Sequence, residues 1–119
     1  MRTTLILFAL TIIFSFTANA QTNNNEKKPL KFNINKSIAN IEKISNQNLE
    51  ILLKASIIEK NDDGYFLIKD DSGNMKVYIT DEQISHIGSY TQDNVFYFTL
   101  KVKNFREQTF TTLEIDKAE

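Results

Sequence analysis

The stretch Tyr65–Thr80, YFLIKDDSGNMKVYIT, decides the fold of this chain. Two runs rich in strand-forming residues, Tyr65–Asp70 and Met75–Thr80, flank the polar sequence DSGN at 71–74. Asp, Ser and Asn side chains bond to nearby backbone groups, and glycine tolerates a left-handed backbone, so the DSGN sequence favours a turn. The stretch therefore predicts a β-hairpin.

The residues before this hairpin predict a helix and then a long strand. Isoleucines recur at every third position of Ser37–Gln47, which favours a short amphipathic helix with Ser37 or Asn35 as its N-cap. Apolar residues then alternate along Asn48–Glu59, as they do in a strand with one buried face. The sequence NDDG at 61–64 predicts a turn between this strand and the hairpin.

A second helix is predicted directly after the hairpin. Thr80 or Asp81 can accept a hydrogen bond at the start of Glu82–Ile87, and Gly88 can end that helix. The lone histidine of the chain, His86, falls on the polar side of this helix, so we expect it to face solvent.

Two further strands are predicted in the last part of the chain, over Asn94–Lys103 and Gln108–Lys117. In the second of them, Phe110 differs in parity from Leu113 and Ile115. Because successive side chains of a strand point to opposite faces, either one of these residues faces out or a bulge corrects the register.

Five strands with a helix between the third and the fourth are the element order of the OB-fold barrel. We therefore expect a mainly β, five-stranded Greek-key barrel over residues 34–119, with a short N-terminal helix before it. In such a barrel the long first strand bends and belongs to both sheets. The residues of the hairpin that we expect to fill the barrel are Phe66, Ile68, Met75, Val77 and Ile79.

Within Ala55–Ile79 the chain carries the pattern Ile57-Ile58-Glu59-Lys60, Asp63, Phe66-Leu67-Ile68-Lys69-Asp70, Ser72-Gly73, Met75, Val77 and Ile79. In this pattern the chain resembles the bacterial OB-fold (BOF) family of small exported stress-tolerance proteins. The resemblance departs from the family at Ala55, where glycine is usual, and at Tyr78, where a small or acidic residue is more common. It implies a periplasmic, non-enzymatic binding module linked to envelope or oxidative stress. The family offers no catalytic residues to carry over.

The outer face of the hairpin is the candidate ligand site, because the second and third strands usually carry the ligand in an OB-fold. Two tyrosines and two lysines on one surface can stack on a base, sugar or peptide while they neutralise an anion. The alternative is an ordinary strand exterior, where tyrosine and lysine are common. The five candidate residues are Tyr65, Leu67, Lys69, Lys76 and Tyr78.

Composition narrows the chemistry further. The chain has 14 Lys and Arg against 15 Asp and Glu, no cysteine and one histidine. A thiolate site is impossible, and we expect no transition-metal site and no cofactor. Without Arg2 and the slightly basic residues 21–33, the domain has a net charge near −4, which disfavours nucleic acid as a ligand. Four carboxylates lie beside the two turns, where turn formation is favoured over cation binding: Asp62, Asp63, Asp70 and Asp71.

The N-terminal residues have the layout of an export signal. Arg2 precedes the apolar run Leu5–Phe16, and Thr17–Ala20 ends in small residues, as signal peptidase requires. The run is shorter than the about 20 apolar residues of a membrane span. We therefore expect a cut after Ala20, a periplasmic location, no membrane span after cleavage, and a flexible polar leader over residues 21–33.

Two alternatives to a ligand-binding module stay open. One is a protein-interaction or inhibitor module that acts through a strand edge. The other is a small hydrolase, although no serine has the sequence context of a nucleophile elbow. We expect the binding partner to be a small ligand or an envelope protein, and the sequence identifies neither.

Overall fold

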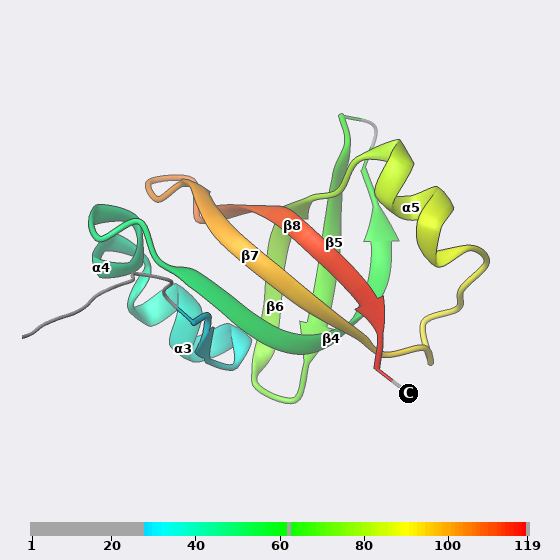
Figure 1. The fold of residues 1–119 in the computed structure, drawn as a ribbon, viewed down its shortest axis with the longest axis horizontal. Helices are drawn as coiled ribbons and strands as arrows, with labels where there is room; N and C mark the ends of the chain where they lie inside the picture. The colour runs from blue at the N-terminus through cyan, green and yellow to red at the C-terminus, as the bar shows by residue number, and fades with distance from the viewer. Residues whose placement is uncertain (1–27, 62, 119) are drawn as a thin grey trace, which may run out of the picture.

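The computed structural model describes residues 28–61 and 63–118, so the expected signal segment and Asp62 lie outside the described part. The described chain forms a closed β-barrel in which each strand pairs with its neighbours in the order β4-β5-β6-β8-β7 and β7 returns to β4 (Figure 1). Only β6 and β8 run parallel within this ring. The five strands are β4 (Glu50–Lys60), β5 (Tyr65–Asp70), β6 (Gly73–Tyr78), β7 (Phe96–Asn104) and β8 (Thr109–Lys117).

This arrangement confirms the predicted OB-fold barrel, including the long bent first strand. The first half of β4, Glu50–Ala55, pairs with β7, and the second half, Ser56–Lys60, pairs with β5. Ala55 sits at the change of partner and is buried, and its backbone is not in the left-handed region. Alanine can therefore replace glycine at this bend without strain.

The interior of the barrel is filled as the alternation of the hairpin predicts. All five residues expected inside are buried, from Val77 and Ile68 at 0% exposure to Phe66 and Met75 at 3%. The last two strands add three aromatic rings, Phe96, Phe98 and Phe110, to this core. Burying rings of this size is the main source of stability in a chain without disulfides.

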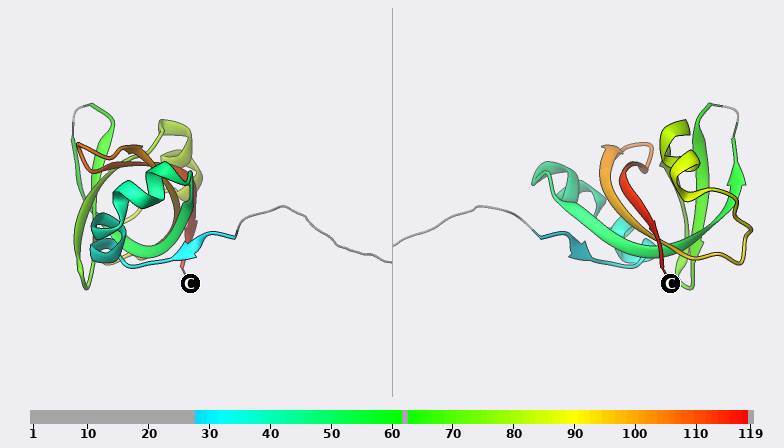
Figure 2. Two further views of the ribbon diagram at one scale, coloured as in Figure 1. Left: turned by 90° about the vertical axis from the view of Figure 1, so that its left-hand side faces the viewer. Right: turned by 45° about the vertical axis from the view of Figure 1, so that its right-hand side comes forward.

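The predicted N-terminal helix is correct in kind but wrong in its bounds. The chain forms two short helices, α3 (Ile34–Ala39) and α4 (Ile41–Asn46), which meet at Asn40. The N-cap is Asn33, whose side chain accepts a hydrogen bond from Lys36 N at 2.8 Å, rather than Ser37 or Asn35. In the left view of Figure 2 these helices lie across one end of the barrel, which explains why they bury isoleucines.

The end of the expected leader is part of the fold. Leu30–Lys31 form the short strand β3, which pairs in parallel with Ile51 and Leu52 of β4. A polar composition without periodicity could not indicate this pairing, because β3 is too short to show any period. The barrel therefore begins before residue 34.

The helix between the third and fourth strands is confirmed. It is α5 (Asp81–Ile87), and it lies on the opposite side of the barrel from α3 and α4 (Figure 1). Thr80 and Gln83 form a reciprocal capping box at its start, with Thr80 Oγ1 accepting from Gln83 N at 3.1 Å. Gly88 ends the helix with a φ of 74°. No described helix has the length and apolar character that crossing a membrane requires.

The register problem in the last strand is solved by a bulge. The pairing of β7 with β8 shifts between Thr99 and Leu100, so Phe110 and Ile115 both point inward. Leu113, between them, is 39% exposed. A single extra residue on one strand is what such a change of parity needs.

Candidate functional site

The five residues predicted to share the outer face of the hairpin do lie together on it. Tyr65 pairs with Tyr78 and Leu67 with Lys76, while Lys69 pairs with Asn74 nearer the turn. The inward residues of the same strands are buried, so alternation directs these side chains out of the barrel. The two tyrosines and Leu67 are half-buried, and both lysines are exposed.

The two tyrosines contact each other edge to face, with ring centroids 5.4 Å apart and ring planes at 71°. The loop before β5 fixes this arrangement. Gly64 has a φ of 88°, and a Cβ at that position would lie 2.9 Å from Cε1 of Tyr78. Only glycine satisfies both the backbone angle and the close approach of the ring. The turn between β4 and β5 is therefore part of the site.

A lysine ammonium lies over each of the two tyrosine rings. Nζ of Lys76 is 5.4 Å from the centroid of Tyr65, and Nζ of Lys103 is 5.3 Å from the centroid of Tyr78. At these distances the positive charge is attracted to the ring face. Neither lysine forms an ion pair with a carboxylate of the described residues. The arrangement therefore offers two positive charges and two aromatic rings to a ligand.

The sequence did not indicate Lys103, which comes from β7 and not from the hairpin. Its side chain reaches Tyr78 across β8, which lies between β6 and β7. A second register shift of the β7–β8 pair falls beside it, between Val102 and Asn104. Its outward parity on β7 is visible in the sequence, but the bulge that sets its position is not. The candidate face therefore spans β5, β6 and β7.

Of the carboxylates beside the turns, Asp70 takes part in turn formation, as the sequence favours. Asp70 Oδ1 accepts hydrogen bonds from Ser72 N, Ser72 Oγ and Gly73 N at 2.7, 2.7 and 3.1 Å. Its Oδ2 accepts from Ile34 N at 2.9 Å, which ties the hairpin turn to α3. No group of three potential metal-ligating side chains occurs in residues 28–61 and 63–118.

These hydrogen bonds also set the charge state of Asp70. Partial burial by itself would raise the pKa of this carboxyl. The hydrogen bonds from Ser72, Ile34 and Gly73 outweigh that effect and hold the pKa below its usual value. Asp70 is therefore an ionised structural group at neutral pH.

His86 faces solvent, as predicted. Its Nε2 lies 4.0 Å from Oδ1 of Asp116, and the two side chains are 70% and 67% exposed. Water screens a pair of this kind, so it gives neither a shielded base nor a fixed orientation.

Comparisons with known proteins identify the fold. No protein-family model matches the chain, and no curated protein sequence matches it significantly. Among solved structures, the hypothetical protein ygiW from E. coli is 17% identical with a TM-score of 0.56, over 77% of this chain and 91% of that one. The S. pombe Stn1–Ten1 complex matches at 11% identity and a TM-score of 0.53, over 79% and 80%.

A further match corrects the expectation about nucleic acid. Replication protein A of U. maydis, solved with bound single-stranded DNA, is 17% identical with a TM-score of 0.50, over 80% of this chain and 77% of that one. Because a protein of this fold carries single-stranded DNA, the prediction from net charge that nucleic acid is disfavoured is wrong. A net charge averages over the whole surface, whereas the tyrosine pair has two lysines beside it.

These matches share the barrel topology of this chain at a level of identity that defines the fold alone. The chain has the OB fold.

Proposed function

We propose that the chain is an exported, non-enzymatic OB-fold binding module whose ligand lies on the outer face of β5 and β6. The residues of this surface, called here the tyrosine–lysine face, are Tyr65, Leu67, Lys76, Tyr78 and Lys103. The observation that carries the proposal is the pair of cation–π contacts, in which each ring of a contacting tyrosine pair has a lysine ammonium over it.

This geometry favours a ligand that joins a planar ring to an anion. An ammonium that rests on a ring occupies the surface on which a ligand would stack. An anionic group that attracts the ammonium frees that surface for a planar ring of the same ligand. A single-stranded nucleic acid has this combination in every nucleotide, and the match to a single-stranded DNA complex supports it as the ligand class to test first.

The test is the affinity of a fluorescently labelled thymidine oligomer of about 12 nucleotides, within the usual site size of an OB-fold. We expect Tyr65→Ala combined with Tyr78→Ala to weaken binding at least about tenfold, since a stacked base contributes about 1–3 kcal/mol. The matched control is Tyr97→Ala, which removes a tyrosine that also has a lysine, Lys54, over its ring at 5.8 Å. Equal losses in the two variants would contradict the proposed face.

Membership of the BOF family, a periplasmic location and a role in envelope or oxidative stress complete the proposal. The sequence pattern of Ala55–Ile79 and the apolar segment before Ala20 support them. N-terminal sequencing of the protein from a periplasmic extract tests the location. We expect the chain to start at Gln21, and a chain that retains Met1 would contradict export by cleavage.

A role in stress tolerance has its own experiment. Cells that lack the protein are compared with cells that carry the wild type or the doubly substituted Tyr65→Ala, Tyr78→Ala protein under peroxide. We expect only the wild type to restore survival. Full restoration by the double variant, at equal protein level and with an intact fold, would separate the stress role from the tyrosine–lysine face.

A further inference from the structure

Part of one edge of β4 has no strand beside it in the described chain. On the side facing β7, the ladder ends where Ala55 pairs with Phe96. From Ser56 to Lys60, β4 pairs only with β5, on its other side. An edge that ends in this way presents backbone N–H and C=O groups that can pair with another chain.

The turn before β7 keeps this edge open. Asn94 Oδ1 accepts a hydrogen bond from Thr91 N at 2.7 Å, and Asn94 N donates to Thr91 O at 3.1 Å. The turn lies directly before Val95, and β7 starts only at Phe96, so the β4–β7 ladder stops at Ala55. If β7 began earlier, its residues would continue the ladder along Ser56–Lys60 and close the barrel completely.

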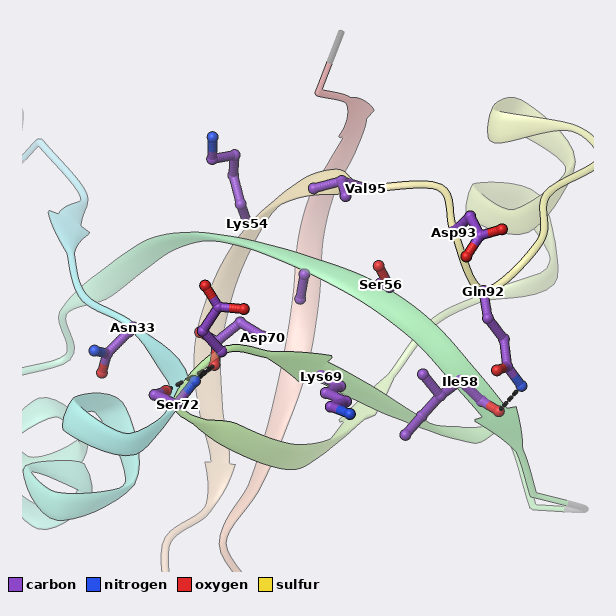
Figure 3. Close-up of a pocket in the computed structure, with 12 residues that line it drawn as sticks. Asn33, Lys54, Ser56, Ile58, Lys69, Asp70, Ser72, Gln92, Asp93 and Val95 are labelled. Atoms are coloured by element: carbon purple, nitrogen blue, oxygen red, sulfur yellow. Dashed lines mark hydrogen bonds between the residues drawn. The ribbon is translucent and has the colours of Figure 1, made fainter.

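A side chain occupies the open edge in place of a strand. Gln92 Nε2 donates to the backbone oxygen of Ile58 at 3.0 Å, as Figure 3 shows. A side-chain amide has the same donor group as a peptide bond, so it can stand where the backbone N–H of an added strand would lie. Ile58 is also at the register shift of the β4–β5 pair. The edge is therefore competent to accept a backbone donor.

A groove of about 810 Å³ runs along this edge (Figure 3). Val95, on one wall, is 43% exposed, the highest value among the exposed large apolar side chains of the described residues. Lys54 and Lys69 are exposed and form no ion pair with a described carboxylate. The residues that define this surface, called here the β4-edge groove, are Lys54, Ser56, Ile58, Lys69, Gln92 and Val95.

We propose that the β4-edge groove binds an extended peptide segment of a partner protein by strand addition. The backbone of the peptide would replace the Gln92 amide at Ile58, and an apolar side chain would cover Val95. This surface shares no residue with the tyrosine–lysine face, although Lys69 lies farther along the same side of β5 as Leu67. The proposal therefore stands whether or not that face binds a ligand.

The lining of the groove favours a peptide over a nucleic acid. No aromatic side chain lines it, so bases have no ring to stack on. Asp71 and Asp93 also line it, and they would repel phosphates. A peptide backbone has both the donors and the acceptors that the free edge requires, whereas a phosphate backbone has acceptors alone.

The test selects binders from a phage-displayed library of random peptides about 10 residues long, with the purified protein as bait. The individual peptides are then synthesised and titrated by fluorescence anisotropy. We expect peptides that lose at least tenfold in affinity on Val95→Asp and are unaffected by the combined Tyr65→Ala, Tyr78→Ala control. A library that yields no binder, or binders that depend on the tyrosines alone, would overturn the proposal.

Two further measurements distinguish strand addition from non-specific binding of peptides. Gln92→Ala removes the side chain that competes for Ile58 O, so peptide affinity should rise, roughly two- to tenfold for one hydrogen bond. Replacing alternate residues of the peptide with proline removes backbone donors and should abolish binding. Unchanged or lower affinity with Gln92→Ala, equal binding of the proline peptide, or tight binding of a thymidine oligomer in the groove would each contradict the proposal.

Discussion

Tyr65 and Tyr78 lie directly opposite each other on β5 and β6, and their rings meet edge to face with centroids 5.4 Å apart. Each ring also has a lysine over it, Lys76 from β6 and Lys103 from β7. Three strands therefore converge on one aromatic and cationic surface. The glycine before β5 allows Tyr78 to approach the backbone, so the turn, the rings and the lysines form one unit.

The lysines should set the salt dependence of binding to a single-stranded oligomer. Each phosphate neutralised contributes about −0.7 to the slope of log affinity against log salt. We expect Lys76→Gln and Lys103→Gln each to reduce the magnitude of that slope by about 0.7. Lys54→Gln is the matched control, and a slope that falls by as much in this variant would contradict the assignment. Titrations of a thymidine oligomer at several salt concentrations measure the slopes of the wild type and the three variants.

Gly64→Ala should lower both stability and ligand affinity. The substitution forces alanine into a left-handed backbone, which costs about 1–2 kcal/mol, and pushes its Cβ against the ring of Tyr78. Gly73→Ala is the control, because its Cβ would meet nothing closer than Ile34 Cγ2 at 4.0 Å. Urea unfolding of the two variants gives the comparison. Equal stability of both variants would show that the turn does not constrain the tyrosine.

Asp70→Asn should change the pH dependence of stability. The pKa of the Asp70 carboxyl is lower in the folded chain than when unfolded, so its ionisation stabilises the fold at neutral pH. This contribution is complete above the unfolded pKa of about 4 and is lost as pH falls through the lower folded pKa. At neutral pH we expect the variant to lose about 1–3 kcal/mol.

The measurement is urea unfolding of wild type and Asp70→Asn between pH 7 and pH 2. The difference in unfolding free energy should narrow as the pH drops below about 4. Asp71→Asn is the control, since Asp71 is exposed and the neighbouring hydrogen bonds go to Asp70. A constant difference between wild type and Asp70→Asn across this range would show that the charge of Asp70 contributes nothing.

The capping box of α5 supplies another prediction. Thr80→Ala removes the acceptor of the Gln83 N–H and should cost about 0.5–2 kcal/mol. Thr80→Ser keeps the hydroxyl and should cost much less. Thermal melts of both variants compare them. If the serine variant melts as low as the alanine variant, the cap does not stabilise the helix.

The barrel could be predicted from the sequence because each strand has a strong local signal. The alternation that buries Phe66 and Ile68 also directs Tyr65 and Leu67 outward. Alternation therefore predicted the four hairpin residues of the tyrosine–lysine face, and it placed Lys69 farther along the same side. The turn sequences and the Thr80 cap are equally local. Features of this kind depend on residues only a few positions apart.

The features of the fold and the site that the sequence did not predict depend on contacts between segments far apart in the chain. The short strand β3 exists only because β4 offers it an edge. The break between α3 and α4 at Asn40 depends on the packing of both helices against the barrel. Lys103 joins the site through a bulge in the pairing of β7 with β8, which no single segment encodes.

The most direct test of the tyrosine–lysine face is an NMR titration of the protein with a thymidine oligomer, followed through backbone amide chemical shifts. We predict saturable shifts concentrated at Gly64–Leu67, Lys76–Tyr78 and Lys103. Shifts that spread evenly over the barrel, that concentrate at Lys54 and Tyr97, or that stay absent at saturating oligomer would contradict this account of the binding face.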